Sequence, residues 1–382
     1  MKPRARLAAS ALLLGLVGTA PAQLPPACLR PEVNVGQAKT FLAYLDGVAS
    51  KTATAAQIEA VLKQEGTELL IAQQNIARRV TAQQYRELLK SLVEKTSKEI
   101  APVDTDQRSR RGIEGLTRDI LPSLHWGVEN VGLLQARLQA LERADVIAAA
   151  KKRSDNALPE TVATCPRLFI VMGGRAGAAA LDNGRIYFDL LITSYRSAAR
   201  DQPPPTVSLI ETFFAHELHH IALETIIGRK RKQLKLNPKD EKIFNFLQTI
   251  VAEGSATYFI NANRDIDQLR SDPEYAAHLA DENALLLQTS EAARALLTAS
   301  EIDDARYQEI TAGLLGAGWH SVGAVMFSVI EKQLGTSEAF EVMRDPRRLL
   351  TVYNRATATD KTSSHFRFDP SLTTRLASLG SE

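Results

Sequence analysis

The most informative stretch of this sequence is His216-Glu217-Leu218-His219-His220. It lies inside a helix-forming segment that runs from about residue 206 to residue 228. On a helix, residues four apart lie on one face, one turn above the other. His216 and His220 can therefore share one zinc ion, each through a metal–nitrogen bond of about 2.0–2.1 Å. Glu217 lies about 100° around the helix from His216. It flanks the ion without bonding it, which suits a general base acting on a zinc-activated water.

The motif has an ordinary alternative, because a single histidine on an apolar helix face is usually a packed residue with a hydrogen-bond partner. With seven histidines in the chain, a chance match to the pattern is on the order of one in a hundred. The two histidines lie in the middle of an apolar stripe that also contains Leu209, Phe213, Leu223 and Ile227. Two imidazoles at ligand spacing, with a glutamate between them, favour a metal.

A catalytic zinc usually has a third protein ligand and one open position. Glu224 shares the histidine face, but about 12 Å of helix rise separates it from His216, so the three cannot close around one ion. Glu224 keeps only a possible role as a hydrogen-bond partner of a ligand imidazole. No later histidine extends the motif, so a carboxylate from another helix is needed.

Glu253 is the candidate for that carboxylate. It lies in a helix that Asn237 and Pro238 open as N-cap and first residue, on a stripe with apolar neighbours. Gly254 beside it costs about 1 kcal/mol of helix propensity, which indicates close approach of another backbone or of a ligand. The competing interpretation is a core carboxylate paired to an arginine.

In this sequence a Glu-Gly-x-Ala helix, at residues 253–256, follows the His-Glu-x-x-His helix by some thirty residues. This arrangement resembles the gluzincin class of zinc metallopeptidases. The chain is also similar to bacterial zinc-dependent peptidases of uncharacterised function. The resemblance covers roughly residues 165–355. It implies His216, His220 and Glu253 as zinc ligands and Glu217 as base. It also implies a downstream residue that stabilises the oxyanion, for which His320 is the proposed position, although relatives often have tyrosine there.

His320 also has an ordinary alternative. It shares a helical face with small residues, which indicates a tight helix crossing at which a histidine would simply be hydrogen-bonded. Tyr258, one turn past Glu253, is a second candidate for the oxyanion role. His219 is expected to pack or to support the ligands, and His278 and His365 have no supporting pattern.

Composition narrows the class of protein. The chain has 382 residues, 45% of them hydrophobic, and a formal charge of +2, which argues against a disordered protein and against nucleic-acid binding driven by bulk charge. Its two cysteines exclude a zinc site of four cysteines. Residues 1–22 have the basic, apolar and small-residue pattern of a secretory signal. We therefore expect an exported protein, periplasmic or secreted, without a membrane anchor. Whether Cys28 and Cys165 pair stays open.

The predicted fold class is α+β and mostly α-helical, with a helical N-terminal region at 23–160 and a zincin-like region at 161–382. Apolar runs at 167–172 and 186–188, with the turn signal Asp182-Asn183-Gly184 between them, predict a small sheet or hairpin. One of the strands, 168–172 or 185–190, is expected to offer an edge that aligns an extended peptide.

The predicted function is an exported zinc-dependent metallopeptidase that acts on a peptide or protein substrate. The alternative is a non-catalytic exported helical protein with a structural or vestigial zinc site. The sequence leaves the substrate, the cleavage mode and the oligomeric state open.

Overall fold

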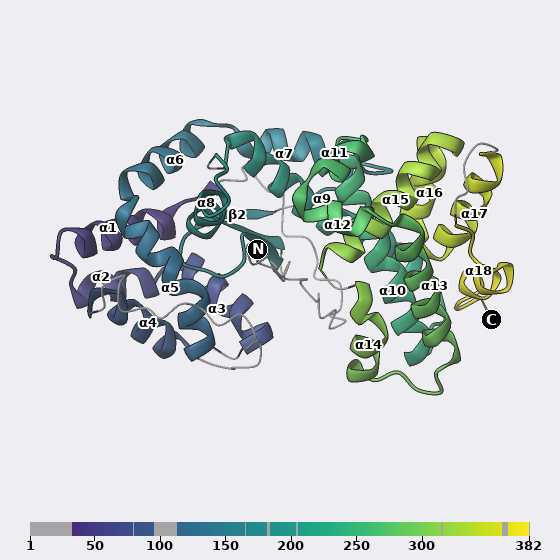
Figure 1. Cartoon of the computed structure of the whole chain (residues 1–382), viewed down its shortest axis with the longest axis horizontal. Coiled ribbons are helices and arrows are strands. Elements are labelled where there is room, and N and C mark those ends of the chain that lie inside the picture. The colour runs from purple at the N-terminus through teal and green to yellow at the C-terminus, as the bar shows by residue number, and fades with distance from the viewer. Residues whose placement is uncertain are drawn as a thin grey trace, which may run out of the picture. The chain divides into compact units, whose positions relative to one another are not determined.

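The computed structural model describes residues 33–78, 80–94, 113–164, 166–181, 184–203, 205–314, 316–360 and 366–381. Helices dominate this part of the chain, and one four-stranded sheet accompanies them (Figure 1), as the α+β prediction states. The signal segment 1–22 and both cysteines lie outside the described residues. Within the described ranges, no single helix is long and apolar enough to cross a membrane, and only one bent pair passes that test when its halves are combined.

Backbone contacts divide the chain into two units. The described residues of the strand-containing unit fall in 22–150 and 165–214, and those of the helical unit fall in 151–164 and 215–382. This division differs from the predicted boundary at residue 160, because the strands of 167–189 pack on helices from the N-terminal region. Two helices pass from one unit to the other, α7 (Val146–Asp155) and α9 (Val207–Arg231).

The strand-containing unit is built around the sheet. Its elements, besides parts of α7 and α9, are β1 (Val33–Asn34), α1 (Gly36–Ala49), α2 (Ala55–Leu62), α3 (Glu65–Arg78), α4 (Ala82–Glu94), α5 (Ile113–Glu129), α6 (Val131–Arg143), β2 (Arg167–Val171), β3 (Ala178–Leu181), β4 (Arg185–Asp189) and α8 (Leu190–Ala198). The strand order is β1-β2-β4-β3, with β1, β2 and β4 parallel and β3 antiparallel to β4. Four of the five residues in β2 and in β4 are buried, as expected for central strands covered on both faces.

The topology corrects two expectations. The apolar runs at 167–172 and 186–188 are both strands, but they pair in parallel, so they do not form a hairpin with each other. The hairpin joins β3 to β4, because the small-residue segment before the turn forms a strand of its own. Neither expected strand is an outer strand, because β2 and β4 lie between β1 and β3 in the strand order. Strand β1 is short and covers β2 only at Leu168 and Phe169.

A buried glutamine ties α1 to the end of β2. Gln37 is 1% exposed. Its side-chain amide donates to the carbonyl of Met172 at 2.9 Å and accepts from the amide of the same residue at 2.8 Å. Both polar ends of the side chain are satisfied, so the burial of this amide carries no desolvation penalty from an unpaired group.

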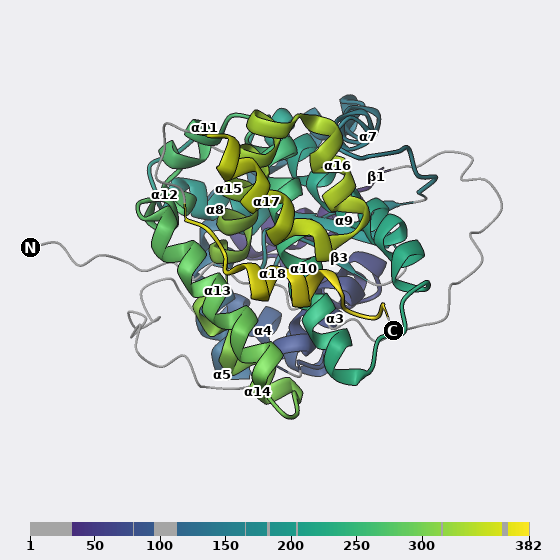
Figure 2. The same ribbon diagram turned by 90° about the vertical axis from the view of Figure 1, so that its right-hand side faces the viewer.

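The helical unit contains the remaining elements. They are α10 (Pro238–Ser255), the π-helix η3 (Ala256–Asn261), α11 (Ile266–Ser271), α12 (Pro273–Leu279), α13 (Glu282–Thr298), α14 (Asp304–Thr311), the 3₁₀-helix η4 (Ala312–Leu314), α15 (Ala317–Leu334), α16 (Thr336–Arg344), the 3₁₀-helix η5 (Pro346–Arg348), α17 (Leu349–Thr359) and α18 (Pro370–Ala377). Helix α15 is buried on nearly all sides, and α10, α13, α16 and α17 pack around it (Figures 1 and 2).

Helices α10 and α15 cross with their backbones in contact. A Cβ built on Gly254 of α10 would lie 2.2 Å from Cα of Gly323 of α15, and one on Gly323 would lie 2.3 Å from the carbonyl oxygen of Ile250. This is the close backbone approach that the position of Gly254 predicts. It brings the helix that carries Glu253 against the helix that carries His320.

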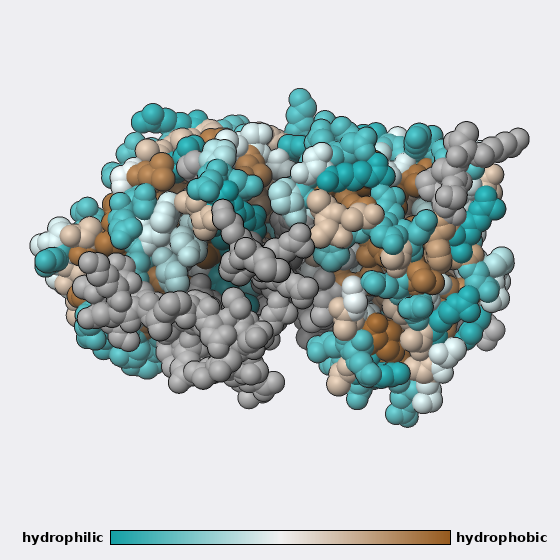
Figure 3. Space-filling view, in the orientation of Figure 1, coloured by the Kyte–Doolittle hydropathy of each residue, from teal (hydrophilic) through white to brown (hydrophobic). Residues whose placement is uncertain are grey.

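Large apolar side chains are scattered over the surface rather than gathered. The exposed ones among the described residues are Val93, Leu133, Leu209 and Leu287. The face drawn in Figure 3 is largely hydrophilic, with small separate hydrophobic patches. Single exposed apolar residues are normal for a folded protein and do not mark a docking site.

Candidate metal centre

Helix α9 carries the two histidines. His216 is 7% exposed, and His220 is half-buried one turn later. Leu223 and Ile227 are buried as the predicted stripe requires, but Leu209 is 41% exposed. The first turns of α9 bury Ile210 and Phe214 instead, because this part packs on β4 through a contact between Phe214 and Phe188.

The last turn of α9 contains the basic run Arg229-Lys230-Arg231. Each of these side chains has an acidic partner, Glu160, Asp345 and Glu241 respectively. Cations at a helix C-terminus also complement its dipole. The basic run therefore stabilises the end of the helix and does not form a free anion site.

Helix α10 carries Glu253, and its start follows the sequence signals. Asn237 is the N-cap, its side-chain oxygen accepts from the amide of Asp240 at 2.9 Å, and Pro238 is the first helical residue. The carboxylate of Glu253 is 16% exposed, and its ion-pair partners are imidazoles. The alternative of a core carboxylate paired to an arginine is therefore not what the structure contains.

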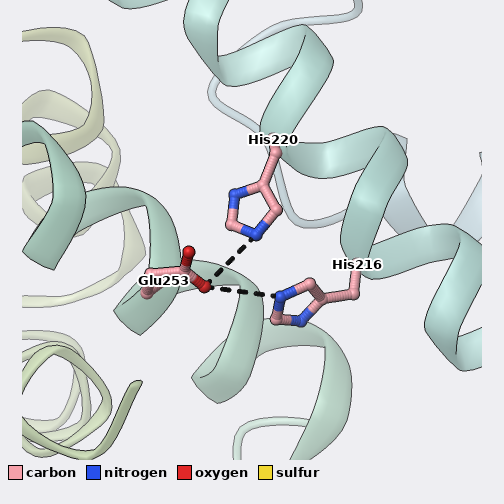
Figure 4. A group of neighbouring side chains, drawn as sticks. All are labelled: His216, His220 and Glu253. Carbon is pink, nitrogen blue, oxygen red and sulfur yellow. Dashed lines mark ion pairs between the residues drawn. The ribbon is translucent and has the colours of Figure 1, made fainter. Parts of the chain in front are cut away.

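The three predicted ligands converge on one point. Oε2 of Glu253 lies 3.6 Å from Nε2 of His216 and 3.3 Å from Nε2 of His220, as the dashed lines in Figure 4 mark. One ligand atom from each residue lies within 4.8 Å of the other two. Tetrahedral zinc ligands with bonds of about 2.0–2.1 Å are about 3.3–3.4 Å apart. The donor set and its spacing therefore fit a zinc ion.

Electrostatics keep Glu253 in its charged form. Burial alone would raise the pKa of this carboxyl, but His320, His220 and His216 together hold it well below its usual range. Burial disfavours a charge on His220, yet Glu253 prevails and raises the pKa of His220 to about 9. The pocket therefore stabilises an anionic oxygen ligand, which is the form that binds a metal.

In both ligand imidazoles Nδ1 is the nitrogen that is not paired with Glu253, and its surroundings differ between His216 and His220. Nδ1 of His216 lies 3.2 Å from Oδ1 of Asn261. Nδ1 of His220 is buried and has no hydrogen-bond partner among the described residues. Nothing in the spacing of Asn261 from the histidines links them in the sequence, so its place beside His216 is evident only in the structure.

His320 contacts the same carboxylate oxygen. Its Nδ1 lies 3.1 Å from Oε2 of Glu253 and 3.0 Å from Oγ1 of Thr257, which is fully buried. Its ring also packs edge-on against Tyr275 of α12, with ring centroids 6.2 Å apart. Burial lowers the pKa of His320 to about 4, against the attraction of Glu253. His320 lies outside the group of three side chains that can share one ion.

The other candidate residues lie elsewhere. His219 is fully buried, and its Nε2 contacts Oγ of Ser255 at 2.7 Å, so it ties α9 to α10. Burial holds the pKa of His219 well below its usual range. Tyr258 interacts with Glu331, and Glu224 is exposed on α9. Neither belongs to the group of possible ligands.

Two imidazoles and a carboxylate, held by neighbouring helices within reach of one ion, define a protein with a candidate His/His/Glu metal site. The chain belongs to the family described as "Putative zinc dependent peptidase (DUF5700)", whose model matches residues 58–362. The match begins well before residue 165, so it includes N-terminal helices that the sequence resemblance left out. No curated protein and no solved structure matches the chain.

Proposed function

We propose that this chain is an exported zinc-dependent peptidase of the zincin-like gluzincin class, which hydrolyses peptide bonds in a peptide or protein substrate. The observation that carries the proposal is the convergence of two Nε2 atoms, from His216 and His220, on one carboxylate oxygen of Glu253. The family match supports both the metal and the reaction. The pattern of residues 1–22 supports export.

The three ligands would hold the metal, and the chemistry would be carried out by the zinc ion and by Glu217. A zinc ion held by them would polarise the scissile carbonyl and activate water for attack. Glu217 takes the proton of the attacking water and passes it to the leaving amine. Its place next to His216 on α9, with a half-buried side chain, supports this role.

His320 has two candidate roles, and its ring nitrogens distinguish them. Oxyanion stabilisation needs an N–H that points at the carbonyl oxygen of the substrate. Nδ1 of His320 faces Oε2 of Glu253, and a neutral imidazole that donates through Nδ1 has only an acceptor at Nε2. The geometry therefore favours a positioning role, in which His320 orients the carboxylate of Glu253. The oxyanion role would require the imidazolium form.

Two substitutions at His320 separate these roles. His320→Asn keeps an N–H near the position of Nδ1, whereas His320→Gln keeps one near Nε2. If His320 positions Glu253, His320→Asn holds zinc nearly as well as the wild type, and His320→Gln binds it about tenfold more weakly. If His320→Gln keeps both zinc and kcat while His320→Asn loses kcat, the oxyanion role is correct.

The test of the proposed function combines metal content with peptide cleavage. We expect about one zinc per mature chain by elemental mass spectrometry, and a large loss of zinc in His220→Ala and Glu253→Ala. Glu217→Gln should keep the zinc and lose about a hundredfold or more in kcat on a peptide library. Glu211→Gln, in the same helix but outside the site, is the matched control and should keep both. A wild-type chain that takes up no zinc on reconstitution would refute the proposal.

The position of His320 bears on the alternative of a structural or vestigial zinc site, because a fourth protein ligand would close the site. A third imidazole nitrogen, Nδ1 of His320, lies beside Oε2 of Glu253 in addition to Nε2 of His216 and Nε2 of His220. If X-ray absorption shows four protein ligands on the zinc and the wild type cleaves no peptide, the site is structural or vestigial. A coordination shell of three protein ligands and one water favours the peptidase.

A further inference from the structure

The helix that carries Glu253 changes its winding just after the candidate ligand. Helix α10 ends at Ser255, and a π-helix continues from Ala256 to Asn261. The amide of Ala262 closes this segment by donating to the carbonyl of Thr257, five residues earlier, at 2.9 Å. Such single π turns inside helices are rare and tend to occur at functional sites. This one lies beside the metal centre.

The wider turn changes which face its last residues occupy. In an α-helix a four-residue step advances a side chain by about 40° around the axis, so two such steps from Glu253 would leave residue 261 about 80° away. A π-helix has about 4.4 residues per turn, so a four-residue step falls about 30° short of a full turn. The π segment therefore returns Asn261 to within about 10° of the face of Glu253.

That face is where the outer nitrogen of His216 lies. Oδ1 of Asn261 is 3.2 Å from Nδ1 of His216. An amide oxygen can only accept, so Nδ1 of His216 carries the proton in this contact, and in the neutral imidazole that binds a metal the lone pair is then on Nε2. Nε2 is the atom that faces Glu253, 3.6 Å from Oε2. The free lone pair thus points at the position of the ion.

We infer that Asn261 is a positioning residue of the metal centre, which holds His216 in its metal-binding tautomer from the end of a π-helical turn. This inference rests on the proposed function, because it concerns the same zinc site. Partners of this kind fix the orientation and the tautomer of a ligand imidazole and increase its basicity. Nδ1 of His220 has no such partner among the described residues, so Asn261 supports one of the two ligand imidazoles.

The test measures zinc affinity on the full mature chain by competition with a chromophoric chelator. We expect Asn261→Ala to bind zinc 10- to 100-fold more weakly. Asn261→Asp keeps an acceptor for Nδ1–H and should bind within a few-fold of the wild type, or more tightly. Asn245→Ala is the control, because it removes an amide from α10 about 12 Å along the helix from Glu253. It should leave the affinity unchanged.

A second measurement reads the tautomer directly. In the zinc-loaded wild type, nitrogen-15 NMR of the histidine rings should show the His216 proton on Nδ1, and Asn261→Ala should broaden or shift that signal. Equal zinc affinity of Asn261→Ala and the wild type would overturn the inference and leave the proposed function intact. Equally weak binding by Asn261→Ala and Asn261→Asp would also overturn it, since only a structural effect treats them alike. Absence of zinc from the wild type would refute the proposed function itself.

Discussion

The crossing of α10 and α15 has no room for a side chain at Gly254, so Gly254→Ala should strain the helical unit. The added Cβ would lie 2.2 Å from Cα and 2.4 Å from the carbonyl carbon of Gly323. Ordinary van der Waals contact begins at 3.4 Å, so the two backbones must separate by about 1.2 Å. The same separation would lengthen the 3.1 Å contact between Glu253 and His320.

The magnitude follows from what the Cβ meets. Overpacking a core costs about 1–3 kcal/mol, and the upper end applies here because backbone atoms have no alternative rotamer. The better helix propensity of alanine offsets about 1 kcal/mol of that cost. We therefore expect the free energy of unfolding to fall by about 2 kcal/mol, which lowers the thermal midpoint of a unit of this size by about 4–8 °C.

The assay uses a tryptophan that reports on this interface. Trp319 lies in α15, and its ring packs edge-on against Phe246 of α10. Trp126 is the other of the chain's two tryptophans, so a Trp126→Phe background isolates the signal. Urea unfolding of the metal-free chain, followed by this fluorescence, gives the free energy of unfolding without a contribution from zinc binding.

Gly228→Ala is the matched control. Gly228 lies in α9, and nothing approaches within 4 Å of a Cβ built there. This variant should be stabilised by up to about 1 kcal/mol. If Gly254→Ala unfolds at the same urea concentration as the wild type or a higher one, while Gly228→Ala gains stability, the backbones do not cross as closely as described. The close crossing of α10 and α15 would then not be what brings Glu253 to His320.

Three further predictions concern other parts of the chain. Burial raises the pKa of Asp189 to about 7, and Tyr85 and Arg196 are the neighbouring charged or titratable groups. The folded state therefore holds a proton that the unfolded chain releases near pH 4, so stability falls as pH rises from about 4 to about 7. In Asp189→Asn the urea midpoint should change less between about pH 4 and about pH 7 than in the wild type. An equal change in both would show that Asp189 is not the group responsible. Asn237→Ala removes the N-cap of α10 and should cost about 1 kcal/mol in thermal unfolding, whereas no loss would mean that water replaces the cap. Arg347→Ala breaks the nearly buried ion pair with Asp345 and a hydrogen bond that Arg347 donates to the carbonyl of Leu379 near the C-terminus. It should cost about 3–5 kcal/mol in urea unfolding, and a cost below about 1 kcal/mol would show that solvent screens the pair.

The sequence by itself determined the features that depend on short-range spacing. The four-residue step from His216 to His220 puts both imidazoles on one helix face in any α-helix. Asn237 and Pro238 mark a helix start because N-capping is local chemistry. Gly254 indicates a close approach because glycine in mid-helix otherwise only lowers stability. From these signals the three candidate ligands follow, and the structure brings them together.

Only the tertiary structure decided the features that depend on how distant segments meet. The parallel pairing of β2 with β4 and the insertion of β3 at the edge depend on backbone hydrogen-bond register, which side-chain periodicity does not encode. The contact of Asn261 with His216 depends on a π turn that shifts every later residue around its helix. The choice of Nδ1 as the atom by which His320 meets Glu253 depends on the angle at which two helices cross. Such relations arise from packing between segments far apart in the chain, and no local pattern specifies them.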